Sequence, residues 1–121
     1  MKKIILAEDD PFLIDIYTVK IKQAGFEIEV VKDGGKVLKI LEQGKPDLLL
    51  LDIVLPNIDG WELLRKIKEQ DKFKDLSVII LSNLGQKQEV KKGFDLGAVK
   101  YLIKAHYTPS EVVEEIKKIL K

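Results

Sequence analysis

The stretch LLLLD at residues 48–52 joins four consecutive leucines to one aspartate. Four apolar residues in a row are typical of a strand that is buried on both faces, whereas a half-exposed strand alternates polar and apolar residues. Strands of this kind occur in parallel sheets that helices cover on both sides. The stretch therefore predicts a central strand of a parallel sheet, with an acidic side chain at its carboxyl end.

Four more short apolar runs accompany this stretch, and helical spacing of apolar residues separates one run from the next. An alternation of five strands with five helices is typical of βαβ units, which build an α/β domain around a parallel sheet. The remaining strands are predicted at Ile4–Ala7, Ile28–Val31, Val78–Leu81 and Ala98–Ile103.

The ends of the predicted helices carry recognisable signals. Asp10 followed by Pro11 is typical of a helix start, and Gly25 and Gly44 are expected to end the first and second helices. The segment Thr108–Glu111 has the Thr-x-x-Glu spacing of a capping box, which predicts the start of the last helix.

Charged residues inside two of the strands predict the order of the sheet. Glu27 and Glu29 flank Ile28 in the second strand, and Lys100 lies within the fifth. Charges in a strand suit the edges of a sheet, where they also oppose edge-to-edge association. We therefore expect the strand order 2-1-3-4-5, which is that of the flavodoxin-like, doubly wound (βα)5 fold.

Composition narrows the functional classes. The chain has 121 residues, no cysteine, and 21 Lys+Arg against 20 Asp+Glu, so its formal net charge is +1. The length indicates one domain. The absence of cysteine excludes disulfides, thiolate metal sites and a cysteine nucleophile. The near-zero charge argues against direct binding of nucleic acid. No apolar run approaches the length of a membrane span or of a signal peptide, so a cytoplasmic protein is expected.

Polar side chains follow the predicted strands at their carboxyl ends. Parallel strands bring these ends to one rim of the sheet, so we expect the side chains to converge there. Carboxylates crowded together need a cation, and hard oxygen ligands without nearby His or Cys favour Mg²⁺. Asp10 is interpreted mainly as the cap of the first helix, with its assistance to the metal left open. The converging residues are Glu8, Asp9 and Asp10 after the first strand, then Asp52, Ser82 and Lys104.

With these residues in place, the chain resembles the receiver domain of two-component response regulators over its whole length. The resemblance is to single-domain, chemotaxis-regulator-like members. It rests on the acidic pair Glu8–Asp9, the segment DIVLPNIDG at 52–60, Ser82, Tyr101 and Lys104 at their respective strand ends. It implies a phosphoacceptor switch made of a single receiver domain over residues 1–121, with no output domain.

The resemblance also implies a role for each site residue. Asp52 would accept a phosphoryl group from a sensor histidine kinase or phosphotransfer protein and form an aspartyl phosphate. Asp9, Asp52 and the backbone carbonyl of Val54 would bind Mg²⁺ directly, and Glu8 would act mainly through a bound water. Such a protein catalyses only its own phosphotransfer and dephosphorylation and is not otherwise an enzyme.

Three further residues are implied to respond to phosphorylation. Lys104 would pair with a phosphoryl oxygen, Ser82 would hydrogen-bond another, and Tyr101 would follow Ser82 inward. These responses to phosphorylation would move the fourth helix and fifth strand. A downstream protein would then bind the face formed by helix 4, strand 5 and helix 5. Val54 and Leu84 lie at the two positions that, in the family, flank the path of the hydrolytic water.

Some residues depart from the family pattern or remain open to interpretation. Ala105 stands where proline usually follows the site lysine, which leaves open whether that peptide bond is cis or trans. Val99 and Lys100 replace the acidic residues found in members that dimerise through the same face, which argues against this dimer. His106 is interpreted as a surface residue, and Trp61 as a cover for the start of the third helix.

Three alternative functions fit these residues less well. An aspartate-nucleophile phosphatase needs a second acid two residues after the nucleophile, where this chain has Val54. A flavin-binding protein needs a phosphate loop after the first strand, where Glu8–Asp10 would repel phosphate. A receiver that has lost phosphorylation is disfavoured by the complete set of site residues.

Overall fold

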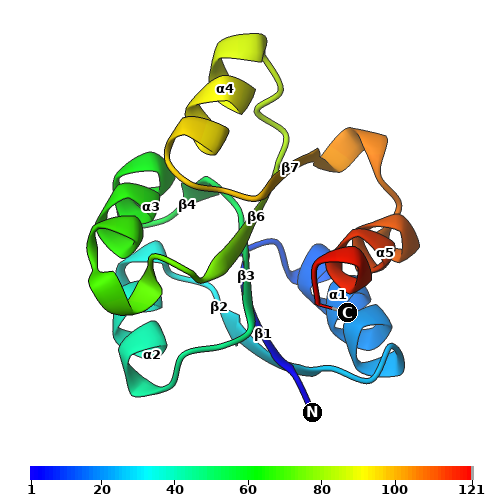
Figure 1. The fold of residues 1–121 in the computed structure, drawn as a ribbon. Helices are drawn as coiled ribbons and strands as arrows, with labels where there is room; N and C mark the ends of the chain where they lie inside the picture. Colours follow the sequence, from blue (N-terminus) through cyan, green and yellow to red (C-terminus); the bar gives the residue numbers. More distant parts are fainter. Residues whose placement is uncertain (121) are drawn as a thin grey trace.

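Five parallel strands form the central sheet of the computed structural model, which describes residues 1–120 (Figure 1). The strands lie in the order β2-β1-β3-β6-β7. β4 and β5 form a separate two-stranded hairpin, so β6 and β7 are the fourth and fifth strands of the sheet. The order is therefore the predicted 2-1-3-4-5, and it confirms the flavodoxin-like α/β fold. The sheet strands are β1 Lys3–Ala7, β2 Glu27–Val31, β3 Leu48–Leu51, β6 Ser77–Ser82 and β7 Lys100–Ile103.

Helices cover the sheet on both faces. Figure 1 shows α1 and α5 together on one face, with α2 and α3 on the other and α4 above them. The helices are α1 Pro11–Gln23, α2 Val37–Gln43, α3 Gly60–Glu69, α4 Lys87–Asp95 and α5 Pro109–Leu120. Short 3₁₀ turns lie at Gly34–Lys36, Asp71–Phe73 and Lys104–His106.

The four leucines of β3 explain why this strand has no polar residue. All four are fully buried. Leu49 and Leu51 belong to the core beneath α2 and α3, and Leu48 and Leu50 belong to the core beneath α1 and α5. Successive side chains of a strand point to opposite faces, so one apolar run fills both cores and fixes β3 in the centre of the sheet.

Charged residues of the edge strands pair with neighbouring elements. The Glu29 carboxylate of β2 lies 2.8 Å from the Lys3 ammonium of β1. The Lys100 ammonium of β7 lies 2.8 Å from the Glu115 carboxylate of α5. These pairs agree with the edge positions that the charges of both strands predicted.

The predicted helix ends are confirmed, but several strand boundaries differ from the prediction. Asp10 caps α1, Gly44 is the residue at the end of α2, and Thr108 and Glu111 form the capping box before α5. β1 begins one residue earlier, at Lys3, and β6 extends one residue further at each end, to Ser77 and Ser82. The second strand begins one residue earlier, at Glu27. The last strand begins at Lys100 and not at Ala98, because the Ala98 amide still bonds back to Gly93 of α4.

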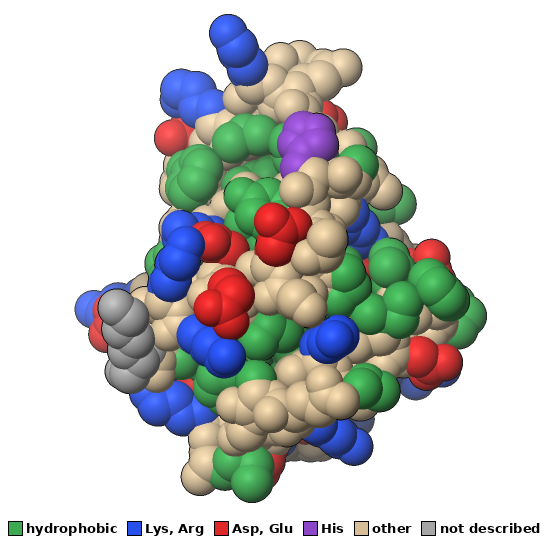
Figure 2. All heavy atoms as spheres, turned by 90° about the vertical axis from the view of Figure 1, so that its right-hand side faces the viewer, with side chains coloured by type: hydrophobic (Ala, Val, Ile, Leu, Met, Phe, Trp, Pro, Cys, Tyr) green, Lys and Arg blue, Asp and Glu red, His purple; other side chains and the backbone are tan. Residues whose placement is uncertain are grey.

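The surface carries charges of both signs. Figure 2 shows one face, where lysines and acids are interspersed and the single histidine is on the surface. His106 is exposed, as predicted. All peptide bonds within residues 1–120 are trans, including that between Lys104 and Ala105. No helix in this part of the chain combines the length and apolar character that a membrane span requires.

Candidate functional site

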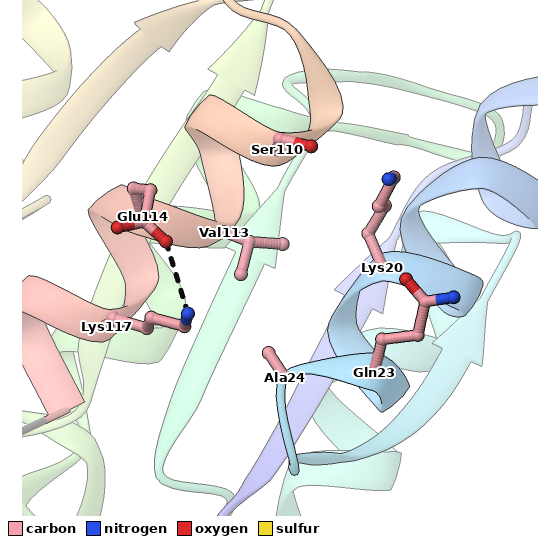
Figure 3. A pocket seen from close by; sticks show the side chains of 7 residues that line it. All are labelled: Lys20, Gln23, Ala24, Ser110, Val113, Glu114 and Lys117. Carbon is pink, nitrogen blue, oxygen red and sulfur yellow. Dashed lines mark ion pairs between the residues drawn. The ribbon is translucent and has the colours of Figure 1, made fainter.

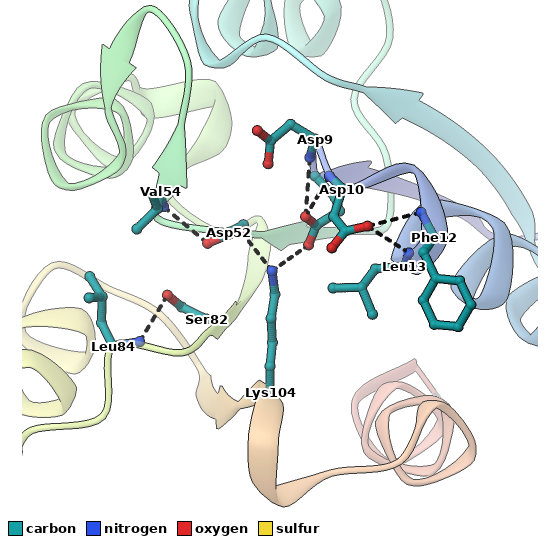
Figure 4. A network of polar contacts seen from close by, with 10 residues as sticks. Asp9, Asp10, Phe12, Leu13, Asp52, Val54, Ser82, Leu84 and Lys104 are labelled. Carbon is teal, nitrogen blue, oxygen red and sulfur yellow. Dashed lines mark hydrogen bonds and ion pairs between the residues drawn. The ribbon is translucent and has the colours of Figure 1, made fainter.

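The carboxyl ends of the sheet strands bring Glu8, Asp52 and Lys104 into direct contact (Figure 4). Glu8 follows β1, Asp52 follows β3 and Lys104 follows β7. The Lys104 ammonium lies 2.7 Å from Oδ2 of Asp52 and 2.7 Å from Oε1 of Glu8. Residues separated by up to 96 positions in the chain thus form one polar cluster at one rim of the sheet.

The environment of Lys104 keeps its ammonium charged. Burial alone lowers the pKa of this group, but the hydrogen bonds and charges of Asp52 and Glu8 outweigh burial and raise the pKa above its ordinary value. A raised lysine pKa contributes stability below the unfolded-state value of about 10.4. That contribution is lost only as pH rises through the still higher folded-state pKa. Lys104 is therefore a fixed positive charge at neutral pH.

Asp52 is held by the start of the loop that follows β3. Its Oδ1 accepts a hydrogen bond of 3.0 Å from the Val54 amide, while Oδ2 faces Lys104. The loop then turns through the hairpin β4 Val54–Leu55 and β5 Ile58–Asp59, with Asn57 at a φ of 72°. A left-handed φ is tolerated by Asn better than by most residues.

Gly60 lets this loop return close to Asp52. A Cβ atom at Gly60 would lie 2.2 Å from the carbonyl oxygen of Ile53, which is a clash with backbone. Only glycine permits α3 to begin this close to the residue after Asp52. Asp59 then caps α3 by accepting a hydrogen bond from the Trp61 amide. The structure therefore explains both residues that end the motif at 52–60, Asp59 as a helix cap and Gly60 as a close backbone approach.

Glu8, Asp9 and Asp52 form the acidic part of the site. One carboxylate oxygen from each lies within 4.8 Å of the others. Oε2 of the buried Glu8 accepts hydrogen bonds from the Asp9 and Asp10 amides, which folds the turn after β1 around the carboxylate. Asp9 is exposed, so its carboxylate can reach a cation that enters from solvent.

The donor set of this cluster fits a hard divalent cation. Glu8 and Asp52 both pair with the Lys104 ammonium, while no ion pair of Asp9 occurs within residues 1–120. Oε1 of Glu8 is fully buried, and the Lys104 ammonium 2.7 Å away is the group that compensates its charge. Three carboxylates facing one ammonium leave an excess of negative charge, and oxygen ligands are those that Mg²⁺ takes in proteins.

Asp10 is a helix cap and does not belong to the acidic cluster. Its Oδ1 accepts hydrogen bonds from the amides of Phe12 at 2.9 Å and Leu13 at 3.4 Å (Figure 4). The group of carboxylates close enough to share a metal contains Glu8, Asp9 and Asp52. This geometry agrees with the interpretation of Asp10 from the sequence.

Asp10→Asn is expected to leave both stability and Mg²⁺ affinity nearly unchanged, because Asn caps helices about as well as Asp. Asp10→Ala is expected to lower the free energy of unfolding by about 1 kcal/mol without a large change in metal affinity. Urea unfolding and Mg²⁺ titration of the two variants measure both quantities. A loss of Mg²⁺ affinity in Asp10→Asn as large as that in Asp9→Asn would place Asp10 among the ligands.

Ser82 and Tyr101 are connected through the chain that follows β6. The buried Ser82 hydroxyl accepts a hydrogen bond of 3.3 Å from the Leu84 amide. The Tyr101 hydroxyl donates to the carbonyl of the same Leu84. Burial raises the pKa of the Tyr101 phenol, which therefore remains a hydrogen-bond donor at neutral pH. Tyr101 already lies inward, with only 9% of its surface exposed.

A cavity of about 330 Å³ opens over these groups. Its walls include Val54 and Leu84 as well as the acids, Ser82 and Lys104. Asn83 also lines it. All the predicted site residues except Tyr101, which lies one contact behind Leu84, therefore surround a single opening.

A second hollow, between α1 and α5, has a different character (Figure 3). It measures about 220 Å³, and its wall includes Lys20, Val113 and the ion pair of Glu114 with Lys117. Figure 3 shows these side chains spread along two helices, without a convergent set of polar groups. The chemistry is concentrated at the strand ends.

Comparison with known proteins agrees with this geometry. The family model described as response regulator receiver domain matches residues 4–117. The DNA-binding dual master transcriptional regulator RpaA of Synechocystis sp. is 31% identical over 121 residues, which are 100% of this chain and 50% of that protein. The chain spans about half the length of the curated relatives it matches.

Solved structures show the same fold. A CheY-like response regulator receiver domain protein from Methanospirillum hungatei has a TM-score of 0.90 and 27% identity, covering 99% of this chain and 94% of that one. The BeF3-activated N-terminal receiver domain of Klebsiella pneumoniae RstA has a TM-score of 0.89 and 26% identity, covering 98% of both chains. The chain thus belongs to the response regulator receiver domain family, the phosphoacceptor switch of two-component systems.

Proposed function

We propose that Asp52 accepts a phosphoryl group from a phosphohistidine on a sensor histidine kinase or a phosphotransfer protein. A carboxylate oxygen of Asp52 attacks phosphorus, the bond from phosphorus to the histidine nitrogen breaks, and an aspartyl phosphate forms. The observation that carries the proposal is the contact of Asp52 with Lys104 at the floor of an open cavity that Ser82 also lines.

Mg²⁺ is the cofactor of this proposal. Asp9, Asp52 and the backbone carbonyl of Val54 are its proposed direct ligands, with Glu8 acting mainly through water. Bound there, the ion supplies charge neutralisation between an anionic nucleophile and an anionic phosphoryl group. Glu8 holds the turn of Asp9 in place through its hydrogen bond from the Asp9 amide.

Lys104 and Ser82 are proposed to receive the transferred group. The Lys104 ammonium already contacts the Asp52 oxygen Oδ2, so it is placed to pair with a phosphoryl oxygen added at Asp52. The Ser82 hydroxyl lies on the cavity wall, where it can exchange its bond with the Leu84 amide for one with the phosphoryl group. Such a charge-driven exchange shifts the loop before α4.

The proposed output is protein binding on the face formed by α4, β7 and α5. Phe94 of α4 and Val99 just before β7 are 48% and 43% exposed, so this face offers apolar anchors to a protein partner. The proposal includes no direct contact with nucleic acid or membrane, a cytoplasmic location, and no catalysis beyond the protein's own phosphotransfer and dephosphorylation.

The experiment that tests this function is incubation with acetyl phosphate and Mg²⁺, followed by intact-mass measurement. We expect a mass gain of one phosphoryl group that disappears when a chelator removes Mg²⁺. An unchanged mass under both conditions, with the protein folded, would contradict the proposal.

Millimolar Mg²⁺ is expected to raise the melting temperature, because binding to the native state alone stabilises that state. At about ten times the dissociation constant the rise should be about 5 °C. Asp9→Asn should reduce this response and should itself stabilise the metal-free protein, since it removes one of three crowded charges. Identical melting curves in Mg²⁺ and in chelator would exclude a metal site at this cluster.

A further inference from the structure

Tyr101 contacts groups from two other elements, the loop before α4 and the first turn of α3. Its hydroxyl donates to the Leu84 carbonyl in the loop before α4. Its ring stacks on Trp61, the second residue of α3, with ring centroids 6.5 Å apart and an interplanar angle of 28°. Offset aromatic pairs at this separation are favourable. The phenol thus joins the Ser82–Leu84 segment to an indole that lies outside the phosphoryl site.

The indole of Trp61 is in turn covered by α4. The Lys92 ammonium of α4 lies 4.9 Å from the centroid of the Trp61 ring, within the range of a cation–π interaction. The adjacent Gly93 lets α4 lie against Tyr101, since a Cβ there would be 2.7 Å from Cδ2 of the Tyr101 ring. Two successive residues of α4 therefore contact the aromatic pair.

We propose that Trp61 and Lys92 are positioning residues that transmit the state of Asp52 from Tyr101 to α4. The inference rests on the proposed function. Bonding of Ser82 to a phosphoryl oxygen frees the Leu84 amide, and the Leu84 carbonyl then shifts together with the Tyr101 hydroxyl. The displaced phenol changes its stack with Trp61, and the indole changes its contact with Lys92.

The expected strength of this route is modest but measurable. An aromatic pair or a cation–π contact changes an equilibrium constant by about two- to tenfold. A shift in either contact therefore biases α4 between two positions. If Trp61 served only to cover the start of α3, a change in its stack with Tyr101 would not reach α4.

The contact between Lys92 and Trp61 is testable without any ligand. Trp61 is the single tryptophan of the chain, so intrinsic fluorescence reports on it alone. Lys92→Met should shift the emission of the free protein. Lys91→Met is the matched control and should not, because the Lys91 ammonium pairs with Asp95 at 2.6 Å. Equal spectra for wild type and Lys92→Met would overturn the contact and the proposal.

Transmission is tested with beryllofluoride and Mg²⁺ as the phosphoryl mimic, at saturation judged from the bound ¹⁹F signal. The wild-type emission should change on binding. In Tyr101→Phe, which keeps the ring and loses the hydroxyl, the change should fall by about twofold or more. A bound ¹⁹F signal with a full response in Tyr101→Phe would overturn the route through Leu84.

A third experiment measures the amide hydrogen exchange of α4 itself, in peptides covering residues 87–95. The change caused by beryllofluoride should shrink by about twofold or more in Lys92→Met and stay at the wild-type size in Lys91→Met. Equal changes in both variants would overturn the proposal while leaving phosphorylation of Asp52 intact. Absence of any bound ¹⁹F signal in the wild type would instead contradict the proposed function, and this inference with it.

Discussion

Asp52→Asn is expected to abolish the mass gain from acetyl phosphate completely. The carboxamide has no anionic oxygen to attack phosphorus, so phosphorylation should be lost completely and not merely slowed. The variant should still fold, because an amide oxygen can accept the bond from the Val54 amide and the Lys104–Glu8 ion pair does not depend on Asp52. Intact mass and a melting curve on the same sample measure both outcomes.

Asp10→Asn is the matched control for this experiment. It makes the same chemical change beside the same cavity, and the Asp10 side chain accepts hydrogen bonds from amides in the first turn of α1. It should gain one phosphoryl group as the wild type does. A full mass gain in Asp52→Asn would show that another carboxylate is the acceptor, and Asp9, which is exposed at the cavity, would be examined first.

The residues that meet at the carboxyl ends of the strands are predictable, because the order of the strands places them there and side-chain packing matters less. Once β3 is recognised as a central parallel strand, the residue after it must lie beside those that follow β1 and β6. Glu8 and Asp52 therefore lie side by side, and Lys104, which follows β7 at the same rim, contacts both, as the sequence predicted. The strand order was predictable for a related reason, since Glu29 and Lys100 exclude β2 and β7 from the interior.

Other features had no signal in the sequence. The hairpin of β4 and β5 has strands of two residues each, too short to show any periodicity. The sequence predicts a start of β7 that is two residues too early, because Ala98 and Val99 are apolar, whereas the Ala98 amide bonds to Gly93 of α4. The stack of Trp61 on Tyr101 depends on how α3 and β7 pack, which no spacing along the chain encodes.

The structure also gives a reason to expect a long-lived aspartyl phosphate. Hydrolysis needs a water aligned opposite the Asp52 oxygen, and Val54 and Leu84 line the cavity through which that water must approach. Val54 is 61% exposed, so its methyl groups stand in the opening. Neither side chain can hold a water by hydrogen bonding. We therefore expect slow loss of the phosphoryl group from the wild-type protein.

The double variant Val54→Asn with Leu84→Glu is expected to speed this hydrolysis by about 10²-fold, the usual contribution of a side chain that orients or activates a water. Phosphorylation should remain possible, because the proposed metal ligand of residue 54 is its backbone carbonyl and Tyr101 bonds to the carbonyl of residue 84. The decay of the phosphorylated mass after removal of the phosphodonor gives the rate.

Val54→Leu with Leu84→Met is the matched control for this rate, since it changes shape at the same two positions without adding a group that binds water. It should decay as slowly as the wild type. Decay of the wild-type phosphoprotein within seconds would show that its water path is already open. Equal rates in the polar and apolar double variants would show that these two side chains do not control the water, and that the lifetime is set by the groups around Asp52 itself.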